Sequence, residues 1–175
     1  AYLSTAWNPP ADGMAIDGAR RAVTWLERAV ADGTDLEARR EILAAALNAG
    51  LAAQKGVGGV HALSRAIEAE PQVNCPHGLL HAALLPPVLA FNRPATLDRT
   101  DVLCHALGLP PGSDLSRAMA EFGVRLGLPP RLGAVPLDEE AVSRIAVRAA
   151  EDPAHLTTPR LATTADIRGL LEAAL

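Results

Sequence analysis

The sequence predicts an all-α domain, built as an irregular bundle of several helices. Alanine and leucine dominate the 175 residues, whereas aromatic residues make up only 3% of them. Strands usually collect β-branched and aromatic side chains, so this composition favours closely packed helices. Apolar positions recur at intervals of three and four residues, as in amphipathic helices, and no repeat of fixed period suggests a solenoid. We therefore expect a single helical domain spanning residues 1–175.

Caps, glycines and prolines indicate where the helices begin and end. Asp12 is a candidate N-cap for the first helix, and Thr34 with Glu37 forms a candidate capping box for the second. Pro71 ends the third, and the long apolar helix after it is expected to continue through a pair of prolines. The predicted helices span residues 12–31, 34–54, 61–70, 76–92, 98–107, 114–126, 138–150 and 163–175.

Charge and cysteine content exclude several classes of protein. The net charge of -4 provides no basic face for nucleic acid or for an anionic membrane. No apolar run reaches the roughly 20 residues that span a bilayer. Cys75 and Cys104 form no CxxC, so neither a disulfide framework nor a structural zinc site is indicated. We expect a cytoplasmic protein without a nucleic-acid or membrane partner.

The candidate site lies between residues 57 and 92, which hold three of the five histidines. His61 and Arg65 are four residues apart, as are His77 and His81, so each pair shares one helix face. Two such faces brought together would form a polar pocket. Neutral imidazole is a common ligand for zinc, iron and copper. Taken singly, however, each histidine is more often a packed or surface residue than a ligand.

Several segments resemble, in order along the chain, the helical C-terminal domain of the iron-containing (group III) alcohol dehydrogenases. They are AYLSTAWNPPADGMAIDGARR, TDLEARREILAAALNAGLA, GGVHALSR, CPHGLLHAALLPPVLAFN and TPRLATTADIRGLLEAAL, and the PHG followed by LLPPVLAFN is the most specific part. The resemblance implies a fold of the dehydroquinate synthase-like type. It also implies an NAD(P)-linked oxidoreductase for a small alcohol or aldehyde, with a divalent metal, Fe²⁺ before Zn²⁺. A dinucleotide-binding domain would precede this sequence, and the protein would form a homo-oligomer.

The resemblance assigns two metal ligands. His61 is similar to the first histidine of the family's HxxxH, and His77 to the histidine of its PHG. The family's other ligands, an Asp and a His, belong to a segment before Ala1. Because catalytic metals usually take at least three protein ligands, we expect these 175 residues alone to bind metal weakly and to be inactive.

Two positions depart from the family pattern, and we predict that both line the substrate side as catalytic residues. Arg65 replaces the second histidine of the HxxxH, and its guanidinium is suited to an acidic group on the substrate. It could instead point to solvent or pair with Glu68 or Glu70. His81 stands where alcohol dehydrogenases of the family carry Asn, and it resembles the maleylacetate reductases, which need not rely on a metal. Two alternatives therefore remain open: a metal-independent reductase of that type, or a non-catalytic helical interaction domain in which the histidines merely pack.

Overall fold

The computed structural model describes residues 1–133, 135 and 137–175, and these residues form helices and no strand. The all-α prediction is therefore confirmed. The α-helices are α1 (Pro9–Ala31), α2 (Leu36–Ala52), α3 (Gly59–Glu68), α4 (His77–Asn92), α5 (Leu97–Ala106), α6 (Leu115–Arg125), α7 (Glu139–Glu151) and α8 (Thr164–Ala174). Short 3-10 turns follow three of them: η1 (Ala53–Lys55), η2 (Arg93–Ala95) and η3 (Pro153–Thr157).

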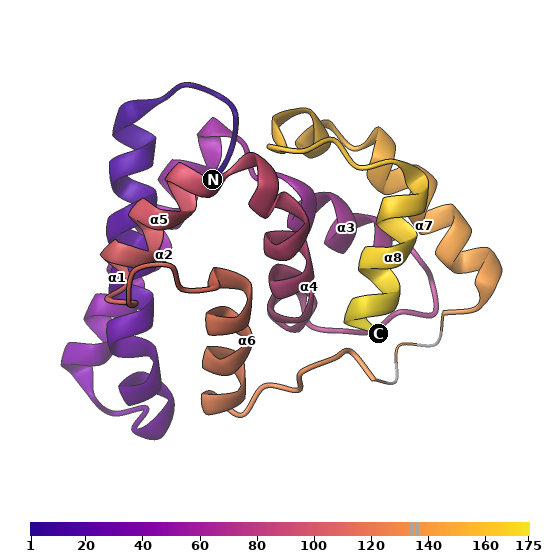
Figure 1. The fold of residues 1–175 in the computed structure, drawn as a ribbon. Coiled ribbons are helices and arrows are strands. Elements are labelled where there is room, and N and C mark those ends of the chain that lie inside the picture. The colour runs from indigo at the N-terminus through magenta and orange to yellow at the C-terminus, as the bar shows by residue number, and fades with distance from the viewer. Residues whose placement is uncertain (134, 136) are drawn as a thin grey trace.

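The helices lie in three groups along the molecule (Figure 1). At one end α1 and α2, joined by a short loop, pack along each other. At the other end α7 packs on α8, and α3 and α4 lie between the two groups. Helix α6 packs beside α4, and α5 contacts α1. The segment with the candidate site is thus at the centre of the fold.

The apolar core joins α3 and α4 to α7 and α8. Its most completely buried apolar side chains are Leu63, Ile67, Leu80, Leu84, Ile145, Ile167 and Leu171. Helix α4 continues through Pro86 and Pro87, as predicted, and the hydroxyl of Ser116 donates to the Pro86 carbonyl at 2.7 Å. This bond links α6 to α4. The α3–α4 pair is therefore held from both sides, by the core and by α6.

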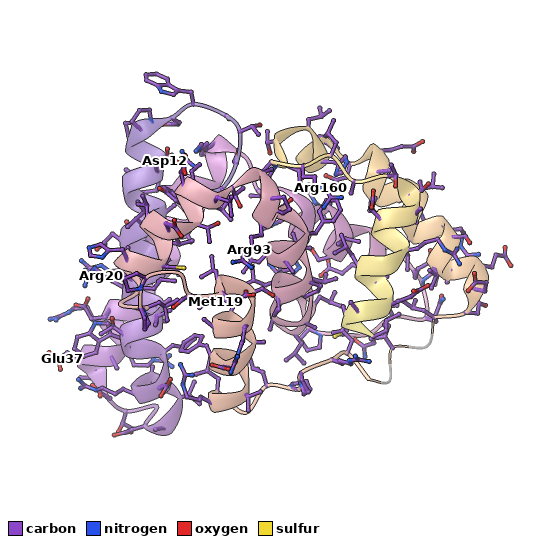
Figure 2. The ribbon with its side chains drawn as sticks, viewed as in Figure 1. Asp12, Arg20, Glu37, Arg93, Met119 and Arg160 are labelled. Atoms are coloured by element: carbon purple, nitrogen blue, oxygen red, sulfur yellow. The ribbon has the colours of Figure 1, made fainter. Side chains whose placement is uncertain are left out.

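Helix α1 begins earlier than the sequence predicts. Its N-cap is Asn8, whose side chain accepts from the amide of Ala11 at 3.2 Å, so the prediction of Asp12 as the cap was wrong. Asp12 lies in the first turns of α1 (Figure 2), and its carboxylate instead pairs with the buried ammonium of Lys55 and, at 3.0 Å, with Arg99. These two cations hold the pKa of Asp12 below its usual value despite burial, which raises it. Asp12 therefore ties the start of α1 to η1 and α5.

The N-cap of α2 also differs from the prediction. Asp35 accepts from the amide of Ala38 at 3.0 Å, whereas the Thr34 hydroxyl donates to Asp32 at 2.6 Å. The predicted capping box of Thr34 and Glu37 was therefore wrong by one residue. A carboxylate is suited to this place because it accepts from free backbone amides at the positive end of the helix.

The loop between α3 and α4 is anchored by a buried carboxylate. Glu70 is 1% exposed and accepts from Arg144 at 2.8 Å and from Arg148 at 2.6 Å, both on α7. Such a carboxylate is stable inside a protein only with partners of this kind. The loop that sets the distance between the two histidine-bearing helices is thus fixed to α7.

Cys75 and Cys104 are both free thiols. Among the residues that the structure describes, no helix is both long enough and apolar enough to cross a membrane.

Candidate metal centre

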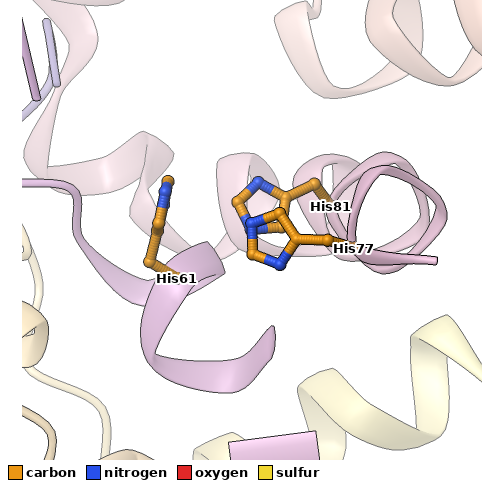
Figure 3. Close-up of side chains that lie close together, drawn as sticks. All are labelled: His61, His77 and His81. Carbon is orange, nitrogen blue, oxygen red and sulfur yellow. The ribbon is translucent and has the colours of Figure 1, made fainter. Parts of the chain in front are cut away.

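Three imidazole rings meet where α3 faces α4 (Figure 3). His61 extends from α3, and His77 and His81 extend from the first turns of α4. The ring centroids of His61 and His81 are 4.4 Å apart, those of His77 and His81 are 4.1 Å apart, and those of His61 and His77 are 6.2 Å apart. Each ring offers one nitrogen in a set whose members all lie within 4.8 Å of one another. Imidazole nitrogens grouped in this way suit iron, zinc or copper.

Hydrogen bonds from α3 hold the two α4 rings. Nδ1 of His77 lies 2.6 Å from the Glu68 carboxylate, and Nε2 of His81 lies 3.0 Å from the Ser64 hydroxyl. The Ser64 hydroxyl also lies 3.2 Å from the His61 carbonyl oxygen. One nitrogen of each α4 ring is thus bound to α3, which leaves the other nitrogen of that ring for a ligand.

Burial keeps two of the rings neutral near physiological pH. Desolvation, and then the nearby His61 and His77, lower the pKa of His81 to about 4. Desolvation and the neighbouring Arg65 also lower the pKa of His61. A neutral imidazole keeps a nitrogen lone pair, which is the form that binds a metal. Two rings of the cluster therefore keep a nitrogen lone pair that a metal ion could use.

Arg65 lies one turn beyond His61 and about half of its side chain is exposed. Its guanidinium pairs with Asp152 at 3.2 Å, between Nη2 and Oδ1. The pairings with Glu68 or Glu70 considered from the sequence are not formed, because Glu68 binds His77 and Glu70 binds α7. Arg65 does not contribute to the lining of the large cavity beside the histidines. It lies next to the cluster, on the side of η3.

The three histidines lie at the edge of a cavity of about 920 Å³. The cavity runs between the α1–α2 pair and α4, and most of its lining is apolar. Small residues form much of the wall, including Gly18, Ala19, Ala22, Ala45, Ala46 and Ala49. Apart from the imidazoles, few polar side chains face it. A cavity that is largely apolar with a few convergent polar groups is typical of a small-molecule site.

The structure brings together the residues that the sequence singled out. It also adds to the site residues that the sequence did not single out. His61, His77 and His81 form one cluster, and Arg65 lies beside it with Asp152 as its partner. Ser64 and Glu68 had not been assigned to the site. Their positions three and seven residues after His61 place them on the same helix face, and this spacing was the available signal.

The chain is similar to known proteins over nearly its whole length. The sequence profile of the Fe-containing alcohol dehydrogenase family, C-terminal, matches residues 1–175. The 4-hydroxybutyrate dehydrogenase of Cupriavidus necator is 38% identical over 178 residues, covering 98% of this chain and 47% of the relative. The NAD-dependent methanol dehydrogenase of Bacillus methanolicus is 29% identical and is covered to 48%. The chain thus spans about half the length of these curated relatives.

Solved structures show the same fold. A 1,3-propanediol oxidoreductase superimposes with a TM-score of 0.91 at 26% identity, over 99% of this chain and 47% of the other. A maleylacetate reductase from Agrobacterium tumefaciens gives a TM-score of 0.85 at 26% identity, over 99% of this chain and 48% of the other. The resemblance inferred from the PHG and LLPPVLAFN segments is confirmed. The chain belongs to the iron-containing alcohol dehydrogenase family and corresponds to its C-terminal helical domain.

Proposed function

We propose that this chain is the metal-binding half of an NAD(P)-linked oxidoreductase that interconverts alcohols and aldehydes. The observation that carries the proposal is the convergence of three imidazoles at the edge of a largely apolar cavity. The named activities of its relatives, alcohol dehydrogenases among them, support the same reaction class. A nucleotide-binding domain from outside these 175 residues would supply the other wall of the site.

The donor set fits a divalent metal. His61 and His77 would hold it, with Fe²⁺ favoured over Zn²⁺ by the family to which the chain belongs. When bound, such a cation acts as a Lewis acid toward the substrate oxygen. The apolar wall of α1 and α2 would exclude water from the substrate. His81, neutral and close to both other rings, would either add a third nitrogen or accept a hydrogen bond from the hydroxyl of an alcohol substrate.

We propose further that the substrate is small and carries an acidic group. Arg65 extends from α3 one turn beyond His61, and its exposed guanidinium has hydrogen-bond donors that Asp152 alone does not use. A guanidinium binds a carboxylate through two parallel charge-assisted bonds. The relative named 4-hydroxybutyrate dehydrogenase, by its name, acts on an alcohol with a carboxylate at the far end.

A reductase that needs no metal is the second candidate. Its support is His81 itself, together with the structural similarity to a maleylacetate reductase. In that reading His81 would act directly on the substrate, and His61 would have a packing role. A non-catalytic helical domain is the third reading.

The test is turnover by the complete protein, followed through the nicotinamide absorbance with a panel of neutral and acidic aldehydes. We expect activity that a chelator removes and that His61→Asn and His77→Asn each abolish, while His105→Asn on α5 serves as the matched control and keeps it. Activity that resists the chelator and depends on His81 would replace the metal mechanism with the second candidate. Absence of turnover with every substrate would favour a non-catalytic domain.

A further inference from the structure

One face of α3 is built to contact the imidazoles of α4. His61, Ser64 and Glu68 follow one another at intervals of three and four residues, so they lie along one stripe of the helix. His61 contributes a ring, while Ser64 and Glu68 each bind one of the two rings opposite. The two polar residues on this stripe therefore contact histidine nitrogens directly.

Glu68 determines which nitrogen of His77 carries hydrogen. An ionised carboxylate only accepts hydrogen bonds, so the contact of 2.6 Å to Nδ1 requires hydrogen on Nδ1. In the neutral ring, Nε2 then keeps its lone pair. Carboxylates that accept from the other nitrogen of a metal-binding histidine orient the ring and raise its basicity.

Ser64 determines in the same way which nitrogen of His81 carries hydrogen, but here the hydrogen is on Nε2 and the lone pair on Nδ1. A hydroxyl has a single hydrogen, and the Ser64 hydroxyl has two contacts, to the His61 carbonyl at 3.2 Å and to Nε2 of His81 at 3.0 Å. The carbonyl can only accept, so both bonds form together when Ser64 donates to the carbonyl and accepts from Nε2–H. In the neutral ring, the lone pair then resides on Nδ1.

We infer that Ser64 and Glu68 are positioning residues that fix opposite tautomers in the two α4 histidines. His77 is held as the Nδ1–H form and presents Nε2, and His81 is held as the Nε2–H form and presents Nδ1. The inference rests on the proposed function in one respect, that the presented nitrogens face a metal or a substrate. Neither residue would touch the reacting atoms itself.

The tautomers are measurable without metal or turnover. Long-range proton–nitrogen correlation spectra of the isotope-labelled, metal-free protein in weakly alkaline solution distinguish protonated from unprotonated ring nitrogens. We expect hydrogen on Nδ1 of His77 and on Nε2 of His81. Glu68→Ala should mix the His77 tautomers, whereas Glu68→Gln, which still offers an accepting oxygen, should keep the Nδ1–H form. Hydrogen on Nε2 of His77 in the unsubstituted protein would overturn the inference.

Zn²⁺ titration by calorimetry provides the second measurement. Glu68→Ala should weaken Zn²⁺ binding by about 10- to 100-fold, the usual effect of removing such a partner, and Glu68→Gln should restore part of the loss. Glu121→Ala on α6, which removes an exposed ion-paired glutamate, is the matched control and should bind as the unsubstituted protein does.

Ser64 is fully buried, so Ser64→Ala can lose stability. Its spectra are therefore compared only if its thermal transition matches that of the unsubstituted protein. The Glu68 variants test the inference independently of Ser64→Ala. Equal Zn²⁺ affinity in Glu68→Ala and Glu121→Ala would count against a positioning role. If the tautomers are as inferred but Zn²⁺ and Fe²⁺ do not bind, the proposed metal function fails and the positioning role remains.

Discussion

Nη1 of Arg148 lies 2.6 Å from Oε1 of Glu70, and this pair fixes the α3–α4 loop against α7. Arg144, first, and then Arg148 lower the pKa of Glu70 below its ordinary value of 4.5. A carboxyl group whose pKa is lower in the folded than in the unfolded state stabilises the fold. This stabilisation is fully present above the unfolded-state pKa and is lost as the pH falls through the folded-state pKa. Glu70→Gln should therefore unfold at a lower temperature at neutral pH, and the difference should shrink below pH 4.5.

Thermal unfolding monitored by circular dichroism across the acid range measures this difference. Glu121→Gln, which breaks an exposed pair with Arg117, is the control and should change little, since exposed pairs contribute about 0–1 kcal/mol. If Glu70→Gln lowers the unfolding temperature equally at every pH, the negative charge of Glu70 is not what stabilises the loop.

Arg65→Ala should discriminate between substrates in the complete enzyme. Removing a charge-assisted bond of about 1.5–3 kcal/mol should raise KM for acidic aldehydes roughly 10-fold or more, with little change for neutral ones. Asp152→Asn, which keeps the cap of η3 but releases the guanidinium, should not raise KM for acidic substrates. Arg125→Ala, which removes an exposed arginine paired with Glu27, is the control. Equal effects on both substrate classes would remove the proposed role.

Gly56 has a backbone conformation that only glycine adopts easily. Its φ is +130°, and a Cβ at this position would lie 2.5 Å from Oγ1 of Thr157. Gly56→Ala should lower the free energy of unfolding by about 1–3 kcal/mol, measured by urea titration. The control is Gly123→Ala in α6, where the space is open and the helical backbone favours alanine by about 0.5–1 kcal/mol. A neutral result at Gly56 would mean that the turn before α3 adjusts freely.

Leu84 on α4 is fully buried among α3, α7 and α8. Leu84→Ala leaves a cavity in the core and should lower the free energy of unfolding by about 2–5 kcal/mol. Leu47→Ala on α2 removes a leucine that is 64% exposed and should stay within about 0.5 kcal/mol. Similar losses in the two variants, measured by urea titration, would contradict the assignment of the core.

His81 should make the metal-free protein sensitive to mild acid. Its pKa is about 4 in the folded chain and 6.5 as the ordinary value, so between these values the unfolded chain binds more protons. Stability should therefore fall as the pH drops from 6.5 toward 4, and His81→Asn should flatten that slope. His105→Asn is the control, and urea titrations at several pH values give the comparison. An unchanged slope in His81→Asn would assign the acid sensitivity to other groups.

Most of the fold could be predicted from the sequence because its helices are bounded by local signals. Apolar periodicity, prolines and glycines placed the helices to within a few residues, and α4 runs through its proline pair as expected. The helix caps were harder to predict. Asp12 is a good cap by type, but Lys55 and Arg99 bind it, and these contacts form only in the folded chain.

The residues of the site, too, could be predicted from the sequence only in part. The positions of His61, His77 and His81 could be singled out from their spacing and from the family resemblance. The partner of Arg65 could not, because Asp152 comes from a distant part of the sequence and no local pattern connects the two. Glu68 was considered only as a partner for Arg65, because helix spacing favours that pair. In the structure, Glu68 instead binds His77 across the interface between α3 and α4.

The three imidazoles all come from one continuous segment, residues 61–81, in which a short loop joins two neighbouring helices. Closing such a short loop loses little chain entropy, and local contacts of this kind form quickly during folding. The ring cluster is therefore expected to be among the earliest long-lived tertiary contacts as the chain folds. The three ring nitrogens would then be brought together early, by residues close to one another in the chain.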